Sequence, residues 1–438
     1  MLVCSRPLML RSLLALLAAG LLAACAPAGV ATDEGALDRA ITRAQADLVR
    51  RPDNVRVRRD LGVLLAQAER FGEAEGYLRQ AYVDDSSDPK TVYYLGLTLE
   101  AEGSRDEAIR FHGQFVRVSP RSPFRPLLQG RYEWLTRERL REEVGDLVAR
   151  EDTLGSDTGP PGVVAVFPFA YLGSDPQFMA LGRGLGEMVT ADLARIGGLQ
   201  VVERVRLQAL LDELSLAQRA AFDQRTTPRL GRLLRAGRAV GGSFDVSDGD
   251  LRVDAALWDL DEPEPALQTR TDDLNRLFRL KREVVLGIVD QIGVTLSPEE
   301  RAALDVVPTR NLQAFLLYAR GLQEEDDGNF AAAASAYQAA VKRDPGFGEA
   351  AARAEQARAV ERAGGSVGKG LAAARTLGNV RRIDLVGSRL QRLNDSVGST
   401  FLPGGTSRNP AGEGATGSGV TFEPLPGPPG PPGGNRPR

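Results

Sequence analysis

The stretch that decides the fold is Val163-Val164-Ala165-Val166-Phe167-Pro168-Phe169, a run of apolar residues with no charge. A continuous apolar run of this length predicts a buried strand. The residues before it, 157–162, are Asp-Thr-Gly-Pro-Pro-Gly, and this composition breaks the preceding helical pattern and predicts a linker. The apolar run therefore marks the start of a separate unit.

Helix and strand signals alternate after this run. They predict helices over 177–196, 207–216, 228–236 and 273–294, a loop over 170–176, and strands over 199–203, 238–246, 251–260 and 266–271. Ser247-Asp248-Gly249-Asp250 predicts a hairpin turn. This order predicts an α/β domain with a mixed sheet and a helical cover over 160–300.

Several segments of this domain carry a resemblance to a known family. They are the apolar run, LGRGLGEMVTADLARIGGLQVVER (181–204), LQALLDELSLAQ (207–218) and LGRLLRAGRAVGGSF (230–244). These segments resemble the periplasmic domain of the curli-secretion lipoprotein family (CsgG/HfaB), and they are similar to TolB-like and flagellar FlgO-like envelope proteins. The resemblance implies a periplasmic module that packs with itself, as a homo-oligomer, or with other envelope proteins.

The same family suggests an alternative function, as a component of an outer-membrane secretion channel. Its channel is built from extra membrane-spanning hairpins, and each such strand needs about 9–11 residues. The predicted connections 170–176, 218–227, 247–250 and 261–265 are too short for an added pair of these strands. We therefore expect a scaffold in preference to a channel.

Helical repeats are predicted on both sides of the α/β domain. Leu61-Gly62 recurs as Leu95-Gly96, an offset of 34 residues. This spacing resembles the tetratricopeptide repeat, in which stacked helical hairpins bury one another's faces. A third match holds the same spacings at Gly321, Ala333, Tyr337, Ala340 and Pro345. We predict repeats and a capping helix over 36–155, and a repeat-like helical region over 308–396.

Repeats of this type bind extended segments along the inner face of their first helices. In this register, the inner positions of the first two repeats are Arg56, Arg59, Lys90 and Tyr93. A basic and partly aromatic groove would suit a carboxylate or an acidic peptide, although a solvated charged face is the alternative interpretation. The equivalent positions of the C-terminal repeat are Phe315, Tyr318, Glu325 and Asp326, so the two grooves are expected to take different ligands.

The N-terminus resembles that of a bacterial lipoprotein. Leu22-Ala23-Ala24-Cys25 follows a short apolar run preceded by Arg6 and Arg11, which is typical of a signal peptide. The resemblance implies removal of residues 1–24, lipid on Cys25 and an anchor linker over 25–35. Ala26 is not the Asp that retains lipoproteins on the inner membrane, so we expect a periplasm-facing outer-membrane lipoprotein. An ordinary secretory signal with a chance cysteine is the alternative.

Composition narrows the chemistry. The chain of 438 residues has 55 basic and 58 acidic side chains and a net charge of −3, which gives no footprint for nucleic acid. It has one histidine, His112, and two cysteines, Cys4 and Cys25. A catalytic triad or a zinc site is therefore not expected. We predict a non-enzyme with no metal and no cofactor.

Two further patterns complete the prediction. Gly182, Gly184 and Gly186 do not have the G-x-G-x-x-G spacing and no P-loop lysine follows them, so we interpret them as sites of close helix packing. A last helix is predicted over 379–394, and the Pro/Gly-rich tail 401–438 is expected to be disordered. The chain as a whole is predicted to be a lipid-anchored envelope scaffold that binds proteins or peptides through its repeats, in a secretion or surface-assembly system.

Overall fold

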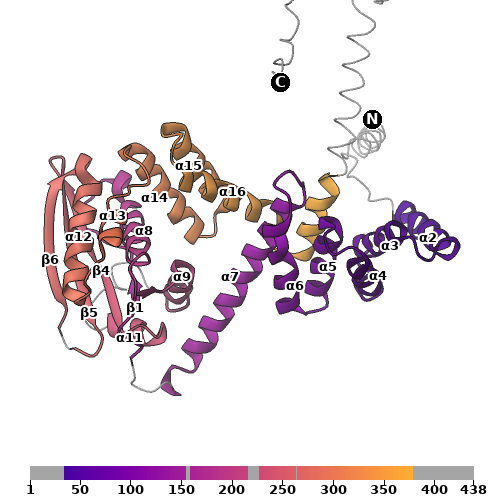
Figure 1. Ribbon diagram of the computed structural model, residues 1–438, viewed down its shortest axis with the longest axis horizontal. Helices are drawn as coiled ribbons and strands as arrows, with labels where there is room; N and C mark the ends of the chain where they lie inside the picture. The colour runs from indigo at the N-terminus through magenta and orange to yellow at the C-terminus, as the bar shows by residue number, and fades with distance from the viewer. Residues whose placement is uncertain (1–33, 154–157, 216–225, 263, 378–438) are drawn as a thin grey trace, which may run out of the picture. The chain divides into compact units, whose positions relative to one another are not determined.

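The computed structural model describes residues 34–153, 158–215, 226–262 and 264–377. The chain divides into two compact units, Met1–Ala374 and Arg375–Arg438, and the contacts described below lie in the first. The predicted signal peptide, Cys25, the helix over 379–394 and the tail over 401–438 lie outside the described residues. In those that are described, helices flank a central mixed sheet, which is the predicted fold class (Figure 1).

Paired helices make up the N-terminal part. After α2 (Glu34–Arg50), the elements are α3 (Val55–Gln67), α4 (Phe71–Asp84), α5 (Pro89–Ala101), α6 (Arg105–His112) and the 3₁₀ turn η1 (Gly113–Arg117). The first helix of each pair has a side-chain cap: Asn54 accepts from the Val57 amide, and Asp88 accepts from the Thr91 amide. Such caps satisfy amide groups that the first turn leaves unpaired. The 25-residue helix α7 (Arg125–Ala149), predicted over 127–150, follows.

The same packing contact recurs in three hairpins. A Cβ added at Gly62 would lie 2.8 Å from Leu78, one at Gly96 would lie 2.4 Å from His112, and one at Gly321 would lie 2.4 Å from Tyr337. In each case the contacted residue follows the glycine by 16 positions. Glycine therefore lets the second helix approach the first closely at the same place in every hairpin. The described residues contain the expected helical hairpins, and their membership of the tetratricopeptide class stays a prediction.

The turn inside each hairpin also recurs. Glu69, Gly103 and Gly328 each follow the packing glycine by seven residues, and their φ angles are 59°, 80° and 78°. A positive φ is the left-handed conformation that ends many helices and that glycine adopts without strain. The first hairpin makes the same turn with glutamate, so the backbone geometry is repeated even where the residue type is not.

The α/β domain has the predicted order of elements. Its strands are β1 (Val163–Val166), β2 (Ala170–Tyr171), β3 (Gln200–Val201), β4 (Arg238–Ser247), β5 (Asp250–Asp259) and β6 (Ala266–Asp273). Their order in the sheet is β3-β1-β4-β5-β6, and β2 pairs with β4. β1 is parallel to β3 and β4, whereas β4, β5 and β6 form antiparallel pairs, so the sheet is mixed as expected.

The first strand differs from the prediction. β1 ends at Val166, and β2 lies inside the predicted loop 170–176. The reason is Pro168, which has no amide hydrogen for a sheet. Phe167 still donates to the Val240 carbonyl at 2.7 Å, but Phe169 donates to the Gly182 carbonyl at 3.1 Å, which belongs to a helix. The apolar run is buried as predicted, although only part of it is a strand.

Helices cover both faces of the sheet. Val164, Val166 and Val240 belong to one core with α8 (Leu181–Leu193) and α12 (Leu277–Ile292). Ala165 and Ala239 belong to the other, with α9 (Arg204–Glu213) and α11 (Thr226–Leu233). Alternate residues of a strand point to opposite faces, which explains this division. Short 3₁₀ turns lie at Glu151–Thr153, Pro176–Phe178 and Leu274–Arg276.

The C-terminal helices return to both earlier parts of the molecule. They are α13 (Pro298–Ala303), α14 (Leu312–Asp326), α15 (Phe330–Arg343), α16 (Gly348–Ala363) and a helical stretch over 367–377. α14 packs against α8, and α16 packs against α7. Among the described residues, no helix combines the length and the apolar character needed to cross a membrane.

The glycines of α8 allow close packing, as predicted. A Cβ at Gly182 would lie 1.8 Å from the Phe169 carbonyl oxygen, and one at Gly184 would lie 2.9 Å from both Phe315 and Ala319 of α14. Gly186 is also tight, at 3.2 Å from the Phe167 carbonyl oxygen. These distances leave no room for larger side chains between α8, the end of β1 and α14.

Candidate functional site

The basic residues of the predicted N-terminal groove lie at the surface among carboxylates. Arg56 is exposed on α3. Arg59 lies 2.9 Å from Asp60 and 3.5 Å from Asp88, and the Lys90 ammonium lies 3.1 Å from Asp60. The two carboxylates neutralise much of the positive charge, so the surface is less basic than its arginines and lysine suggested.

Tyr93, the aromatic residue of that groove, is covered by the chain itself. It is fully buried, and its hydroxyl donates to the Gly370 carbonyl at 2.8 Å. Arg131 of α7 is also fully buried and donates to the carbonyls of Ala363, Gly365 and Ser366 at 2.9, 2.7 and 3.2 Å. The chain after α16 therefore occupies the aromatic end of the predicted groove.

The equivalent face of the C-terminal hairpin is covered too. Phe315 and Tyr318 of α14 are buried, and α8 packs onto Phe315 through Gly184. The Tyr318 hydroxyl donates to Glu349 of α16 at 2.5 Å. In both places a glycine of the covering segment, Gly370 or Gly184, lies against the aromatic side chain of the first helix.

Next to Phe315 and Tyr318 lies a cluster of buried charges, which we call the acidic junction. Its centre is Glu325 and Asp326, at the end of α14. Asp326 pairs with Arg183 and Arg204, and Glu325 lies 3.0 Å from Arg204 and 3.3 Å from Arg353. Glu325 also pairs with Arg137 of α7 and accepts from the Tyr337 hydroxyl at 2.7 Å.

The electrostatics of Glu325 favour its charged form. Burial by itself would raise its pKa, but the attraction of Arg204, Arg353 and Arg137 outweighs this and lowers the pKa to about 2. The carboxylate therefore stays ionised although it is almost completely buried. It forms ion pairs with arginines from α7, α9 and α16, and these pairs connect the α/β domain to the helices on either side.

Sequence reasoning located the two carboxylates but missed their partners. Arg137, Arg183, Arg204 and Arg353 come from four different helices, and Arg137 is 188 residues from Glu325. No local spacing connects them. The only signal was Arg183, which lies among the apolar residues of α8. A helix face that is buried against a partner does not tolerate such a charge without a counter-charge.

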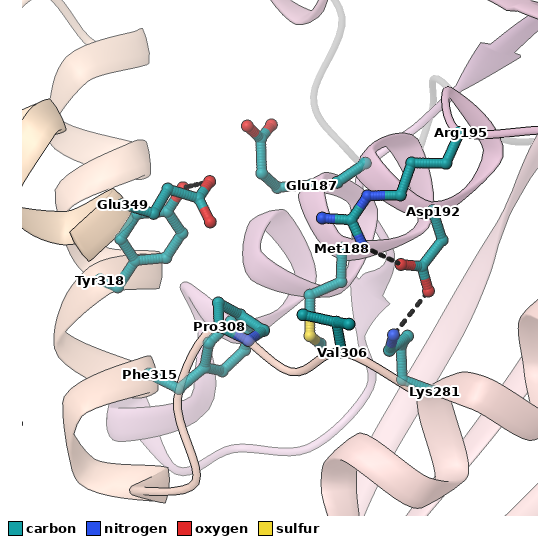
Figure 2. A pocket seen from close by; sticks show the side chains of 11 residues that line it. Glu187, Met188, Asp192, Arg195, Lys281, Val306, Pro308, Phe315, Tyr318 and Glu349 are labelled. Atoms are coloured by element: carbon teal, nitrogen blue, oxygen red, sulfur yellow. Dashed lines mark hydrogen bonds and ion pairs between the residues drawn. The ribbon is translucent and has the colours of Figure 1, made fainter. Parts of the chain in front are cut away.

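A cavity of about 70 Å³ lies beside the acidic junction, and we call it the junction pocket. Residues of α8, α12, α14 and α16 line it, together with Val306 and Pro308 of the connection before α14. Figure 2 shows Glu187 and Glu349 on one side and Asp192, Arg195 and Lys281 on the other. Lys281 is buried and its ammonium lies 2.5 Å from Asp192. Burial raises the pKa of Asp192, and the hydrogen bond and charge of Lys281 oppose this rise.

His112 and the acidic groups do not form a metal centre. His112 is completely buried against Gly96, and neither ring nitrogen has a hydrogen-bond partner. Burial and the nearby charge of Arg131 hold its pKa well below the usual value, so the imidazole is neutral. Over the described ranges, no three His, Cys, Asp or Glu side chains are grouped as metal ligands would be.

The fold and this site together describe a protein in which buried ion pairs hold an α/β domain between helical hairpins. Residues 167–246 match the family model described as "Curli production assembly/transport component CsgG". The matched segment runs from Phe167 through α8, β3, α9 and α11 to the end of β4. The chain therefore contains a CsgG-like domain, in agreement with the resemblance seen in the sequence.

A distant likeness is found among solved structures. The LpoB C-terminal domain from Salmonella enterica is 14% identical, with a TM-score of 0.21, over 30% of this chain and 95% of that one. The comparison with curated proteins gives no match.

Proposed function

We propose that the protein is an envelope-associated scaffold with no catalytic role, in a secretion or surface-assembly system. It assembles through the CsgG-like domain and binds proteins or peptides through its helical hairpins. The observation that carries the proposal is the family match over 167–246, whose description names assembly and transport. The acidic junction supports it, because its buried ion pairs connect the α/β domain to helices on either side, and removing one partner of such a pair is costly.

Attachment to the membrane is the first part of the proposal. Cys25 carries lipid, and two or three acyl chains there give stable anchoring. The test is fractionation of cells that express Cys25→Ser. We expect the variant in the soluble envelope fraction, and Cys4→Ser, which lies within the predicted signal peptide, is the control that stays with the membrane. Retention of Cys25→Ser in the membrane would refute the lipid anchor.

Self-assembly is the second part. Among the described strands, β6 pairs with β5 alone and ends the sheet. An edge strand offers unpaired backbone groups to another chain. Leu267 of β6 is 72% exposed, so this edge also presents an apolar side chain. These features support an interface on this side of the sheet.

The test of self-assembly is sedimentation of the full chain. Leu267→Lys is expected to shift the protein toward monomer. Val83→Lys places the same change at an equally exposed position on α4 and serves as the control. A wild-type protein that stays monomeric at all concentrations would contradict this part of the proposal and leave the lipid anchor untouched.

Partner binding is the third part, and it concerns Arg56, Arg59 and Lys90. Because Tyr93 is covered by residues near Gly370, an acidic partner would meet the charged end of the groove first. Cross-linking in intact membranes tests this. Arg56→Glu with Lys90→Glu is expected to reduce a specific cross-linked product several-fold, whereas Arg43→Glu, an exposed change on α2, leaves it intact.

The word "transport" in the family description favours one second candidate, a component of an export channel. It predicts ion conductance when the purified protein is added to a lipid bilayer. Conductance that Cys25→Ser does not abolish would favour the channel, and silent bilayers would favour the scaffold.

A further inference from the structure

We propose that the junction pocket is a binding site for a small zwitterion, an α-amino acid with little or no side chain. The ammonium group of the ligand lies at Glu349 and its carboxylate lies at Lys281.

The cationic end of the pocket holds a buried lysine and an exposed arginine. Lys281 is 2% exposed, and an ammonium group has three N–H donors. Among the described residues, the Lys281 ammonium donates to the Asp192 carboxylate at 2.5 Å. Arg195 adds a second positive charge 3.8 Å from the same carboxylate. Two cations share one anion, so this end has an excess positive charge and donors to spare.

The acidic end holds two carboxylates, Glu187 and Glu349. Glu349 is exposed at this end and holds the Tyr318 hydroxyl as its hydrogen-bond donor. Glu187 accepts from Arg353 at 2.8 Å with one oxygen, while its other oxygen is buried without a hydrogen bond, 3.4 Å from Arg204. Glu187 is therefore already paired with two arginines, whereas Glu349 accepts from a neutral hydroxyl, so an ammonium group at this end would add a charged donor at Glu349.

The walls between these ends are apolar. Met188, Val306, Pro308 and Phe315 line the pocket together with the charged groups (Figure 2). Low polarity strengthens each charge-assisted hydrogen bond made inside the pocket. A simple anion would meet Glu187, Glu349 and Asp192, and a simple cation would meet Lys281 and Arg195. A ligand with both charges at its two ends avoids both conflicts.

The volume of the pocket limits the ligand. About 70 Å³ is several times the space that one water needs and about half of the engineered cavity that holds benzene. This admits roughly five or six non-hydrogen atoms, which is the size of glycine or alanine. A ligand of this size can reach a Kd of about 1 mM without exceeding the usual energy per atom.

Isothermal titration of the purified full chain with glycine and alanine tests the proposal. We expect both to bind with a Kd near 1 mM. Acetate and methylamine, which each carry one of the two charges, are expected to bind at least tenfold more weakly, and phenylalanine is expected not to fit. The proposal is overturned if acetate or methylamine binds as tightly as glycine. It is also overturned if glycine at about ten times that Kd gives no heat.

Two variants locate the site. Glu349→Gln removes the acidic end at an exposed position and is expected to weaken glycine binding at least tenfold. Glu355→Gln, the same change on an exposed part of α16, is the matched control and leaves binding unchanged. Ala191→Leu fills the pocket and is expected to abolish binding. Binding that survives Glu349→Gln at full strength would refute the site even if Ala191→Leu failed to fold.

Discussion

Arg131 of α7 donates to the carbonyl oxygen of Ala363 at 2.9 Å, although 232 residues separate the two in the chain. The contact satisfies the carbonyl of the last residue of α16, because the last carbonyls of a helix have no partner inside it. Arg131 also pairs with Glu100 of α5. One buried guanidinium therefore joins the second hairpin to the end of the C-terminal helices.

The first prediction concerns this guanidinium. Arg131→Ala leaves Glu100 buried without a counter-charge and three carbonyls without donors, so we expect a loss of about 3–5 kcal/mol in the free energy of unfolding. Amide hydrogen exchange over 364–374 is expected to become faster. Arg139→Ala is the control, because its ion pairs with Asp106 and Glu143 are 3.5 Å long and exposed, and such pairs contribute less than about 1 kcal/mol. Unchanged exchange over 364–374 would contradict the prediction.

The second prediction concerns acid stability and Glu325. Its pKa in the folded protein is about 2, below the ordinary value of 4.5, so the unfolded chain binds a proton that the folded chain does not. This stabilisation is complete above pH 4.5 and is lost as the pH falls toward 2. A shift of this size corresponds to about 3 kcal/mol. Urea unfolding between pH 5 and pH 2 measures it.

Glu325→Gln supplies the comparison for that measurement. The variant is expected to be less stable at neutral pH, because Arg137, Arg204 and Arg353 lose their shared carboxylate. Its stability is also expected to fall less steeply in acid than that of the wild type. A slope that matches the wild type, or that changes equally in Glu355→Gln, would show that the acidic junction does not titrate as a unit.

The third prediction concerns His112. Burial first, and then the charge of Arg131, lower its pKa well below 6.5, so the unfolded state takes up a proton before the folded state does. The stability that follows from neutral His112 is therefore present above about pH 6.5 and declines below it. His112→Leu is expected to remove this decline between pH 6.5 and 5, because Leu78 occupies the equivalent place in the first hairpin. A decline that persists in the variant would argue against the prediction.

The fourth prediction compares two helical glycines. A Cβ at Gly130 of α7 would lie 2.0 Å from the Ala359 carbonyl oxygen of α16, whereas one at Gly76 of α4 meets nothing within 4 Å. Gly76→Ala is expected to stabilise the protein by about 0.5–1 kcal/mol, because alanine loses less entropy in a helix. Gly130→Ala is expected to destabilise it by about 1–3 kcal/mol, because the two backbones must move apart. Thermal unfolding of both variants measures the difference in sign.

Much of the fold followed from local pattern. The offset of 34 residues predicted the hairpins of Gly62 and Gly96, and the spacing around Gly321 predicted the third. The alternation of apolar segments predicted the order of strands and helices in the α/β domain. Pro168 is the exception, because the apolar character of 163–169 concealed a residue that cannot continue a sheet.

The candidate site followed from the sequence only in part. The repeat register placed Tyr93, Phe315 and Tyr318 on inner faces, but it could not show that Gly370 and Gly184 would lie against them. Lys281 gave no signal at all, because a lysine on a predicted helix is ordinarily a solvated side chain.

The sequence by itself determined most of the helices and strands, because apolar runs and turn residues act over a few positions of the chain and the 34-residue spacing repeats such a local pattern. The tertiary structure alone decided which groups meet. Arg137, Arg183, Arg204 and Arg353 converge on Glu325 and Asp326 because burial in a medium of low polarity makes an uncompensated charge too costly. That requirement operates through space and leaves no spacing in the sequence from which it could be predicted.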